Sequence, residues 1–218
     1  IEDPIEMVEG SFNQMQVQQN IDLTFADGVR ALLRQDPDII MVGEIRDLET
    51  AEMAIQAALT GHLVLSTLHT NDAPSAITRL LELGVPPYLI KATVMGVMAQ
   101  RLVRTLCPDC KEVTTVDEQD WAELTSPWRS ALPRNACKPV GCLECRDTGY
   151  KGRQGVYEVL PLTPQVKSLI GEQTDIAVLR KQAIKDGMQT LRISGAQKIA
   201  SGMTTIEEVL RVTPVSHS

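Results

Sequence analysis

The sequence predicts an α/β domain that is followed by a small metal-held insertion and a C-terminal helical bundle. Three observations predict this organisation. Short apolar runs alternate with helix-like spacings over the first hundred or so residues, two pairs of closely spaced cysteines follow, and helical periodicity returns after Pro164. The expected boundaries are residues 1–106 for the α/β core, 107–155 for the insertion and 156–218 for the C-terminal helical region.

The first part of the core reads as a helix, a strand and a second helix. Residues 24–35 carry apolar side chains at helical spacing, and Pro37 stops that helix. Residues 39–42, Ile-Ile-Met-Val, form a continuous apolar run, which is typical of a strand buried on both faces. Asp47 can cap the next helix, which we expect to end at Thr60.

The rest of the core continues the alternation. A second buried strand is expected at residues 63–65, then a helix that Asn71-Asp72 precede and that ends near Gly84, and another helix from about 87 to 106. This order implies a largely parallel sheet with helices on both of its faces. The apolar stretch at residues 85–100 is interrupted by Lys91 and is too short to span a bilayer.

The C-terminal region has helical periodicity throughout. Threonines that precede two of its helices can act as N-terminal caps, because a side-chain oxygen there accepts a free backbone N–H. We expect helices at 165–171, 175–187, 190–202 and 205–211, with Thr174 and Thr204 as caps.

The composition disfavours a general nucleic-acid binder. The net charge is −7 at pH 7, whereas such binders gain most of their affinity by neutralising phosphates with Lys and Arg. The chain has only 2 Trp, 3 Tyr and 2 Phe, so a platform for stacking bases is not expected either.

The insertion contains two C-x-x-C pairs, separated by 31 residues. Four thiolates at this spacing can close a tetrahedral Zn²⁺ site, and the expected ligands are Cys107, Cys110, Cys142 and Cys145. The alternative is a set of reduced thiols without a metal. The fifth cysteine, Cys137, is either a plain buried thiol or a ligand in place of Cys142.

An acidic residue follows the first predicted strand. Glu44 lies just beyond residues 39–42, at the carboxyl end of a parallel strand, which is where open α/β sheets bind ligands. A carboxylate there can organise Mg²⁺, usually through water, or polarise an attacking water. The alternative is a solvated acid beside the cap of the helix that starts after Asp47.

The run from Leu33 to Asp47, LRQDPDIIMVGEIRD, resembles the signature of the type II secretion and type IV pilus assembly ATPases over its fifteen positions. The resemblance implies a RecA-like P-loop NTPase core whose N-terminal part is truncated here. It also implies that residues 39–42 are the Walker B strand. Glu44 would be the acid of that strand and a catalytic residue in a site that binds ATP and Mg²⁺.

Two more segments resemble the same family. IEDPIE at residues 1–6 is similar to the end of its Asp box, which by position assigns the acid acting on the attacking water to Glu2, with Asp3 and Glu6 as weaker candidates. The alternative for this segment is a turn, because Asp-Pro often starts one.

GHLVLSTLHTN at residues 61–71 is similar to the family's His box. The resemblance implies that His69, just beyond a strand end, senses the γ-phosphate and that Thr70 beside it binds nucleotide. His62 precedes the strand and is expected to be structural.

Three arginines complete the implied site. Arg30 and Arg34 are four residues apart and share a helix face, and Arg46 follows the Walker B strand. In the resembling family such arginines contact phosphates, lie at subunit interfaces or support the site, and a guanidinium suits phosphate by its fixed bidentate donors. The alternative is ordinary surface salt bridges with Asp27, Asp36 or Asp38.

The phosphate-binding motif G-x-x-x-x-G-K-[ST] is absent from these 218 residues. In the resembling family it precedes the Asp box, so we expect this fragment alone to fold but not to hydrolyse ATP. The tetracysteine motif points to the secretion and pilus-extension branch, because the retraction ATPases generally lack it.

The resemblance implies a cytoplasmic motor that is peripheral to the inner membrane. Its cofactors would be ATP, Mg²⁺ and Zn²⁺, and it would act as a homohexamer on an inner-membrane platform protein to power pilus or pseudopilus assembly, without inserting into the bilayer or binding nucleic acid. The alternatives are a RecA-like nucleic-acid translocase, which the acidic composition disfavours, and a non-catalytic zinc adaptor, which the presence of Glu2 and Glu44 disfavours.

Overall fold

The computed structural model describes residues 1–128 and 130–213. Contacts between residues divide the chain into two compact units. Unit 1 contains residues 1–70, 74–95 and 162–179, and unit 2 contains residues 71–73, 96–161 and the described residues from Arg180 onward.

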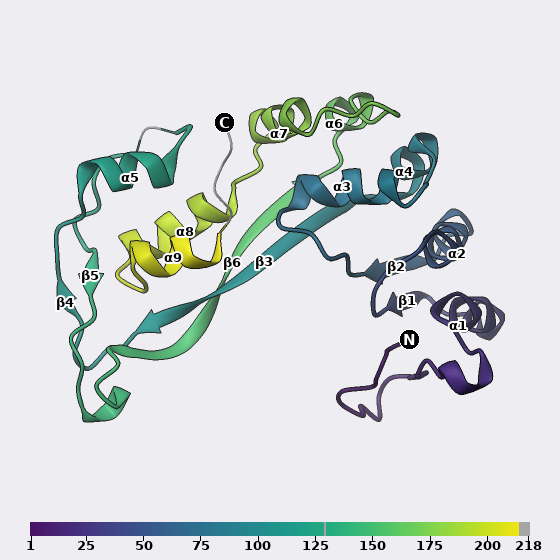
Figure 1. Ribbon diagram of the computed structural model, residues 1–218, viewed down its shortest axis with the longest axis horizontal. Helices are drawn as coiled ribbons and strands as arrows, with labels where there is room; N and C mark the ends of the chain where they lie inside the picture. Colours follow the sequence, from purple (N-terminus) through teal and green to yellow (C-terminus); the bar gives the residue numbers. More distant parts are fainter. Residues whose placement is uncertain (129, 214–218) are drawn as a thin grey trace. The chain divides into compact units, whose positions relative to one another are not determined.

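The centre of unit 1 is a pair of parallel strands, β1 (Ile39–Val42) and β2 (Leu63–Ser66), with Ile39 opposite Leu63 (Figure 1). This pairing confirms both predicted strands and their parallel direction. The helix α1 (Phe25–Leu32) precedes β1, and α2 (Leu48–Leu59) connects the two strands. The short 3-10 turns are η1 (Gln19–Ile21) and η2 (Leu33–Gln35).

Local capping signals set the beginnings of these helices. Thr24 and Asp27 form a reciprocal capping box at the start of α1. The carboxylate of Asp47 accepts the backbone N–H of Thr50 at 2.7 Å and caps α2, as the sequence predicted.

One face of the β1–β2 pair is covered and the other is not. Val29 of α1 and Ala57 of α2 pack with Ile40 and Val42 in a common core. The alternate side chains of the strands, namely Ile39, Met41, Leu63 and Leu65, are 45–59% exposed. The expectations that residues 39–42 and 63–65 are buried strands and that helices cover both faces of the sheet are therefore wrong for the described residues, because successive strand residues point to opposite faces and helices cover only one.

The predicted helix at 87–106 is also wrong over most of its length. The helix α4 (Pro87–Thr93) ends at Thr93, and residues Gly96–Leu106 form the strand β3. Burial in β3 follows a period near two, with Ala99 and Val103 buried between more exposed neighbours. Side chains of a strand alternate between its two faces in this way. A short apolar run fits a helix or a strand equally well, and pairing with a partner strand makes this one a strand.

That partner is β6 (Tyr150–Pro161), which pairs antiparallel with β3 from Gly96 opposite Pro161 to Leu106 opposite Tyr150. The two strands form the long ribbon of unit 2 in Figure 1. The predicted boundary near residue 155 falls inside β6, and the sequence-based prediction contains no strand there.

The C-terminal helices pack on the ribbon as well as on each other. α8 (Leu191–Ala200) contacts β6, α9 (Ile206–Val212) contacts β3, and the two helices contact each other. A Cβ on Gly195 would lie 2.3 Å from a methyl group of Val209, so the glycine permits the close approach of α8 and α9. The remaining helices are α3 (Ala73–Glu82), α6 (Pro164–Ser168) and α7 (Ile176–Lys185).

The predicted threonine caps are each displaced by one residue. Thr205, and not Thr204, accepts the N–H of Glu208 and caps α9, whereas the Thr204 hydroxyl donates to the carbonyl of Arg104. Asp175, and not Thr174, accepts backbone N–H groups at the start of α7.

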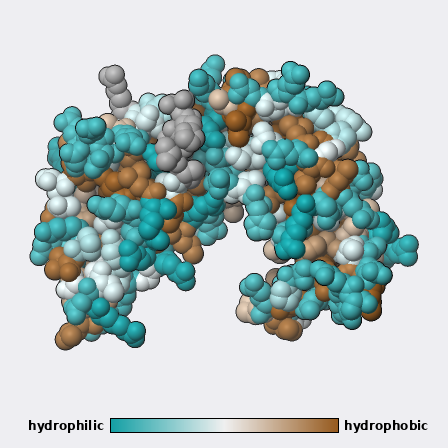
Figure 2. All heavy atoms as spheres, viewed as in Figure 1, coloured by the Kyte–Doolittle hydropathy of each residue, from teal (hydrophilic) through white to brown (hydrophobic). Residues whose placement is uncertain are grey.

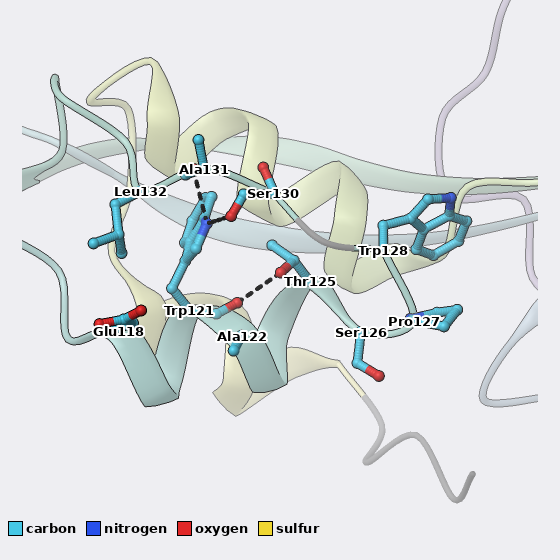
Figure 3. A pocket seen from close by; sticks show the side chains of 10 residues that line it. All are labelled: Glu118, Trp121, Ala122, Thr125, Ser126, Pro127, Trp128, Ser130, Ala131 and Leu132. Atoms are coloured by element: carbon cyan, nitrogen blue, oxygen red, sulfur yellow. Dashed lines mark hydrogen bonds between the residues drawn. The ribbon is translucent and has the colours of Figure 1, made fainter.

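The segment between the cysteine pairs contains β4 (Glu112–Val113), α5 (Glu118–Thr125) and β5 (Cys137–Lys138), and the second pair includes the 3-10 turn η3 (Leu143–Cys145). The indole N–H of Trp121 donates to the carbonyls of Ser130 and Ala131 beside a cavity of about 630 Å³ (Figure 3). Its lining contains none of the predicted site residues.

The ranges 1–106, 107–155 and 156–218 were predicted from the roles expected of each segment. The two units are defined by contacts, so the predicted ranges remain a prediction.

Apolar side chains also appear on the surface, as brown patches in Figure 2. Among the described residues, none of the helices has the length and hydropathy needed to cross a bilayer.

Candidate active site and metal centre

The loops that follow β1 and β2 are bonded side by side. The Thr67 hydroxyl donates to the carbonyl of Gly43 at 2.6 Å, and the N–H of Ile45 donates to the carbonyl of Thr67 at 3.0 Å. Parallel strands end at the same edge of a sheet, so these bonds place the residues after both strands at one edge, where ligands of α/β sheets bind. Thr67 is not among the site residues predicted from the sequence; the signal for it is a hydroxyl directly after the second strand.

Glu44 is the centre of this edge. One carboxylate oxygen accepts from the guanidinium of Arg46, and the other lies 3.1 Å from Nε2 of His69. The side chain of Glu44 is only 15% exposed, whereas that of His69 is 87% exposed. The structure thus brings three of the predicted site residues together.

The environment of Glu44 favours its charged form. The hydrogen bond from Arg46 lowers the pKa of the Glu44 carboxyl, and His69 acts in the same direction, while desolvation opposes both. Glu44 is therefore held as a carboxylate, the form that can orient a metal-bound water or accept a proton.

The N-terminal segment lies along the end of β1. The N–H of Gly43 donates to the carbonyl of Ile1 at 2.8 Å, and a Cβ on Gly43 would approach that oxygen to 3.0 Å. Gly43 thus permits the contact that brings Glu2 to this edge. The Glu2 carboxylate accepts from the side-chain amide of Gln14 at 2.9 Å, so the first six residues are more than an isolated turn.

The weaker acidic candidates differ in their surroundings. Asp3 is exposed, and its charge is among the influences that raise the pKa of Arg46 after the larger effect of Glu44. Glu6 is exposed.

The structure does not bring Arg30 or Arg34 to Glu44. Arg30 pairs with Asp27 at 2.6 Å and more loosely with Glu49 at 3.8 Å, which agrees with the salt-bridge alternative. Arg34 is exposed on η2, beyond the carboxyl end of α1.

The remaining residues of the predicted His box take separate positions. The backbone N–H of Thr70 donates to the carbonyl of Leu68 at 3.1 Å. His62 stands before β2, with Nδ1 2.9 Å from the carbonyl of Ala57 and 3.0 Å from the Thr60 hydroxyl, in line with a structural role.

The four predicted zinc ligands form one cluster in unit 2. The sulfur atoms of Cys107, Cys110, Cys142 and Cys145 all lie within 4.8 Å of one another. The fifth cysteine is outside the cluster, and Cys137 Sγ lies 3.5 Å from the carbonyl of Asn135. Cys137 is therefore not a substitute for Cys142.

Backbone groups around the cluster are arranged for thiolates. The N–H of Gly141 donates to Cys110 Sγ at 3.3 Å, and the N–H groups of Cys142 and Gly149 donate to Cys145 Sγ at 3.2 Å. Burial raises the pKa of the Cys107 thiol to about 12, whereas at Cys145 the N–H donors of Cys142 and Gly149 outweigh burial and lower the pKa to about 7. Four convergent sulfurs with N–H donors fit a closed, tetrahedral Zn²⁺ site.

Comparison with known proteins gives relatives over almost the whole chain. The chain is 62% identical over 216 residues to the type IV pilus assembly ATPase TfpB of Acinetobacter baylyi, covering 99% of this chain and 37% of that protein. It is 50% identical over 214 residues to the type II secretion system protein E of Pseudomonas aeruginosa, covering 98% of this chain and 42% of that protein. The chain thus spans about two fifths of the length of these curated relatives.

Solved structures show the same fold. The crystal structure of the pilus retraction motor PilT with bound ADP has a TM-score of 0.67 and 29% identity, over 98% of this chain and 51% of that one. The Legionella pneumophila ATPase DotB has a TM-score of 0.64 and 25% identity, over 96% of this chain and 49% of that one. The family model described as type II/IV secretion system protein matches residues 1–211. The sequence motifs, the fold and these matches agree, and the chain belongs to the type II/IV secretion system protein family.

Proposed function

We propose that the protein carrying this chain is a Mg²⁺-dependent ATP hydrolase that powers pilus or pseudopilus assembly. The observation that carries the proposal is the pairing of Glu44 with His69 across the ends of two adjacent parallel strands. The names of the relatives, which include pilus assembly and secretion ATPases, support the same class of function.

In this proposal Glu44 is the acid that acts on Mg²⁺ or on the attacking water. Phosphoryl transfer depends mainly on positioning and on stabilising charge. Glu44 suits this role because Arg46 keeps it ionised, so that it can bind Mg²⁺ or orient a water, and because its side chain is largely shielded from solvent. The imidazole of His69 contacts Glu44 and is otherwise mostly exposed. It is therefore free to meet a phosphate bound at this edge.

Glu2 is proposed to contribute a second carboxylate at the same edge. Its backbone is held beside β1 by the Ile1–Gly43 bond, and Gln14 orients its side chain. Thr70 is proposed to contact nucleotide next to His69. Arg46 supports Glu44 directly, whereas Arg30 and Arg34 are proposed to act on a nucleotide from a neighbouring copy, because they lie apart from Glu44 here.

The tetracysteine cluster is proposed to hold Zn²⁺ as a structural ion. A closed four-thiolate site leaves no open position for a substrate, so the metal would fix the fold of the insertion. We further propose a homohexamer that is cytoplasmic, peripheral to the inner membrane and coupled to a membrane platform protein.

The test is an ATPase assay on the full-length protein, with and without Mg²⁺. We expect Mg²⁺-dependent hydrolysis by the full-length protein and none by the 218-residue chain, which has no G-x-x-x-x-G-K-[ST] loop to cradle the phosphates. A full-length protein that bound ATP but did not hydrolyse it would overturn the proposal. Strand displacement without pilus or secretion activity would favour the nucleic-acid translocase instead.

A further inference from the structure

Three consecutive residues just after His69 are each held by a different side chain of unit 2. Arg101 of β3 donates to the carbonyl of Asn71 at 2.8 Å. Arg180 of α7 donates to the carboxylate of Asp72 at 2.7 Å, and Glu158 of β6 accepts the N–H of Ala73 at 2.8 Å. The contacts come from positions 30 to 108 residues away in the sequence.

These anchors are largely shielded from water. Glu158 is 2% exposed and Asp72 is 6% exposed. Burial raises the pKa of the Glu158 carboxyl, and the N–H of Ala73 partly opposes that rise. Groups buried in this way are costly to leave without a partner, so the contacts hold the segment firmly.

Glu158 also ties this segment to a second helix. Its other oxygen accepts the N–H of Leu191, the first residue of α8, at 3.3 Å. One buried carboxylate therefore joins the start of α3, at Ala73, to the start of α8. The free N–H groups of both helix ends favour a negative charge there.

We propose that Arg101, Glu158 and Arg180 form a positioning clamp that couples the His69 edge to the β3–β6 ribbon and α8. The peptide chain runs from His69 through Thr70 directly into the clamped residues Asn71–Ala73. A change in the position of His69 when nucleotide binds is passed to this segment, and the clamp transmits it to β3, β6 and α8. The inference rests on the proposed ATPase function and assigns no chemical step to the clamp.

The experiment uses the full-length protein and the variant Glu158→Gln. An amide has one acceptor oxygen and an NH₂ donor, so Gln cannot accept from both Ala73 and Leu191 in the way the carboxylate does. The matched control is Glu208→Gln, because Glu208 is also 2% exposed and accepts the N–H of Arg104 in the same ribbon without touching Asn71–Ala73.

Two readouts separate transmission from simple loss of stability. The first is kcat for ATP hydrolysis together with the dissociation constant for a non-hydrolysable ATP analogue. The second is hydrogen exchange in α8 with and without that analogue. For Glu158→Gln we expect kcat to fall by about tenfold, within the range typical of coupling between sites, with the dissociation constant nearly unchanged. The analogue-dependent change in α8 exchange, present in the wild type, should disappear.

For Glu208→Gln we expect kcat and the exchange response to stay near wild type under conditions where both variants are folded. Arg101→Lys, which keeps a donor for the Asn71 carbonyl, should lose less activity than Arg101→Met, which has none. Equal effects of Glu158→Gln and Glu208→Gln, or an unchanged exchange response in Glu158→Gln, would overturn the clamp. A wild-type protein without ATP hydrolysis would instead refute the proposed function.

Discussion

The carboxylate of Glu44 and the imidazole of His69 lie 3.1 Å apart, although 25 positions separate them in the sequence. They meet because β1 and β2 are adjacent and parallel, so the residues that follow both strands share one edge. The pairing places the acid of the predicted Walker B strand beside the histidine of the predicted His box.

Arg46→Ala should move the acid limb of the pH–rate profile to higher pH. Glu44 is proposed to act as a carboxylate, so activity falls as the pH drops through its pKa. Arg46 lowers that pKa, and its removal therefore raises it. The measurement is kcat against pH for the full-length protein. Arg79→Ala is the control, because Arg79 pairs with Glu82 on α3 and not with Glu44. An unshifted acid limb would show that Arg46 does not tune the catalytic acid.

Purified protein should contain about one zinc ion per chain, as expected for a closed four-thiolate site. Cys110→Ser should lower the zinc content and loosen the segment between the cysteine pairs, while the β1–β2 core of unit 1 stays folded. Elemental analysis and hydrogen exchange measure the two effects. Cys137→Ser should keep its zinc, because Cys137 lies outside the cluster. Equal zinc loss in both variants would contradict the ligand assignment.

Acid should weaken unit 2 partly through Glu208. The hydrogen bond from Arg104 lowers the pKa of the Glu208 carboxyl from 4.5 to about 2, so its contribution is present above pH 4.5 and is lost as the pH falls towards 2. A shift of this size corresponds to about 3 kcal/mol in the free energy of unfolding. Denaturant unfolding at several pH values should show a smaller acid-induced loss for Glu208→Gln than for wild type. Glu207→Gln, at an exposed neighbouring position, should keep the wild-type pH dependence.

Gly195→Ala should destabilise the packing of α8 against α9. The added methyl group would lie 2.3 Å from a methyl carbon of Val209, and overpacking of this kind costs about 1–3 kcal/mol. Thermal unfolding measures the loss. Adding Val209→Ala should make the Gly195→Ala change less costly than it is alone, because the clash is then removed. Gly171→Ala is the control, since no heavy atom lies within 4 Å of the place that a Cβ on Gly171 would take. Additive effects of Gly195→Ala and Val209→Ala would contradict this packing.

The sequence predicted those parts of the fold that depend on local signals. Asp47 caps α2 as expected, and the two apolar runs form the parallel strands β1 and β2. The cysteine spacing also identified four sulfurs that converge. In each case a few neighbouring residues are enough to determine the structure. They form a helix cap, an apolar run of strand length or the spacing of metal ligands.

The errors arose where distant segments decide the structure. Residues 96–106 became a strand because they pair with 150–161, across more than forty intervening residues. The contact between Glu158 and Ala73 spans 85 positions, and that between Arg180 and Asp72 spans 108. The spacing of apolar residues within one segment gives no information about contacts between segments so far apart. The only sequence signal at Glu158 is an acid between the apolar residues Val156 and Leu160 on the same strand face.

The most direct test of the proposed function is the variant Glu44→Gln in the full-length protein. The change removes the charge next to His69 and Arg46 while nearly keeping the shape, so it affects chemistry more than binding. We predict ATP binding close to that of wild type and a loss in kcat of about 10²-fold or more, as is usual when a group that handles a proton or metal-bound water is removed. Turnover near the wild-type rate, with ATP still bound, would contradict the account and leave Glu44 as an acid that only supports the strand end.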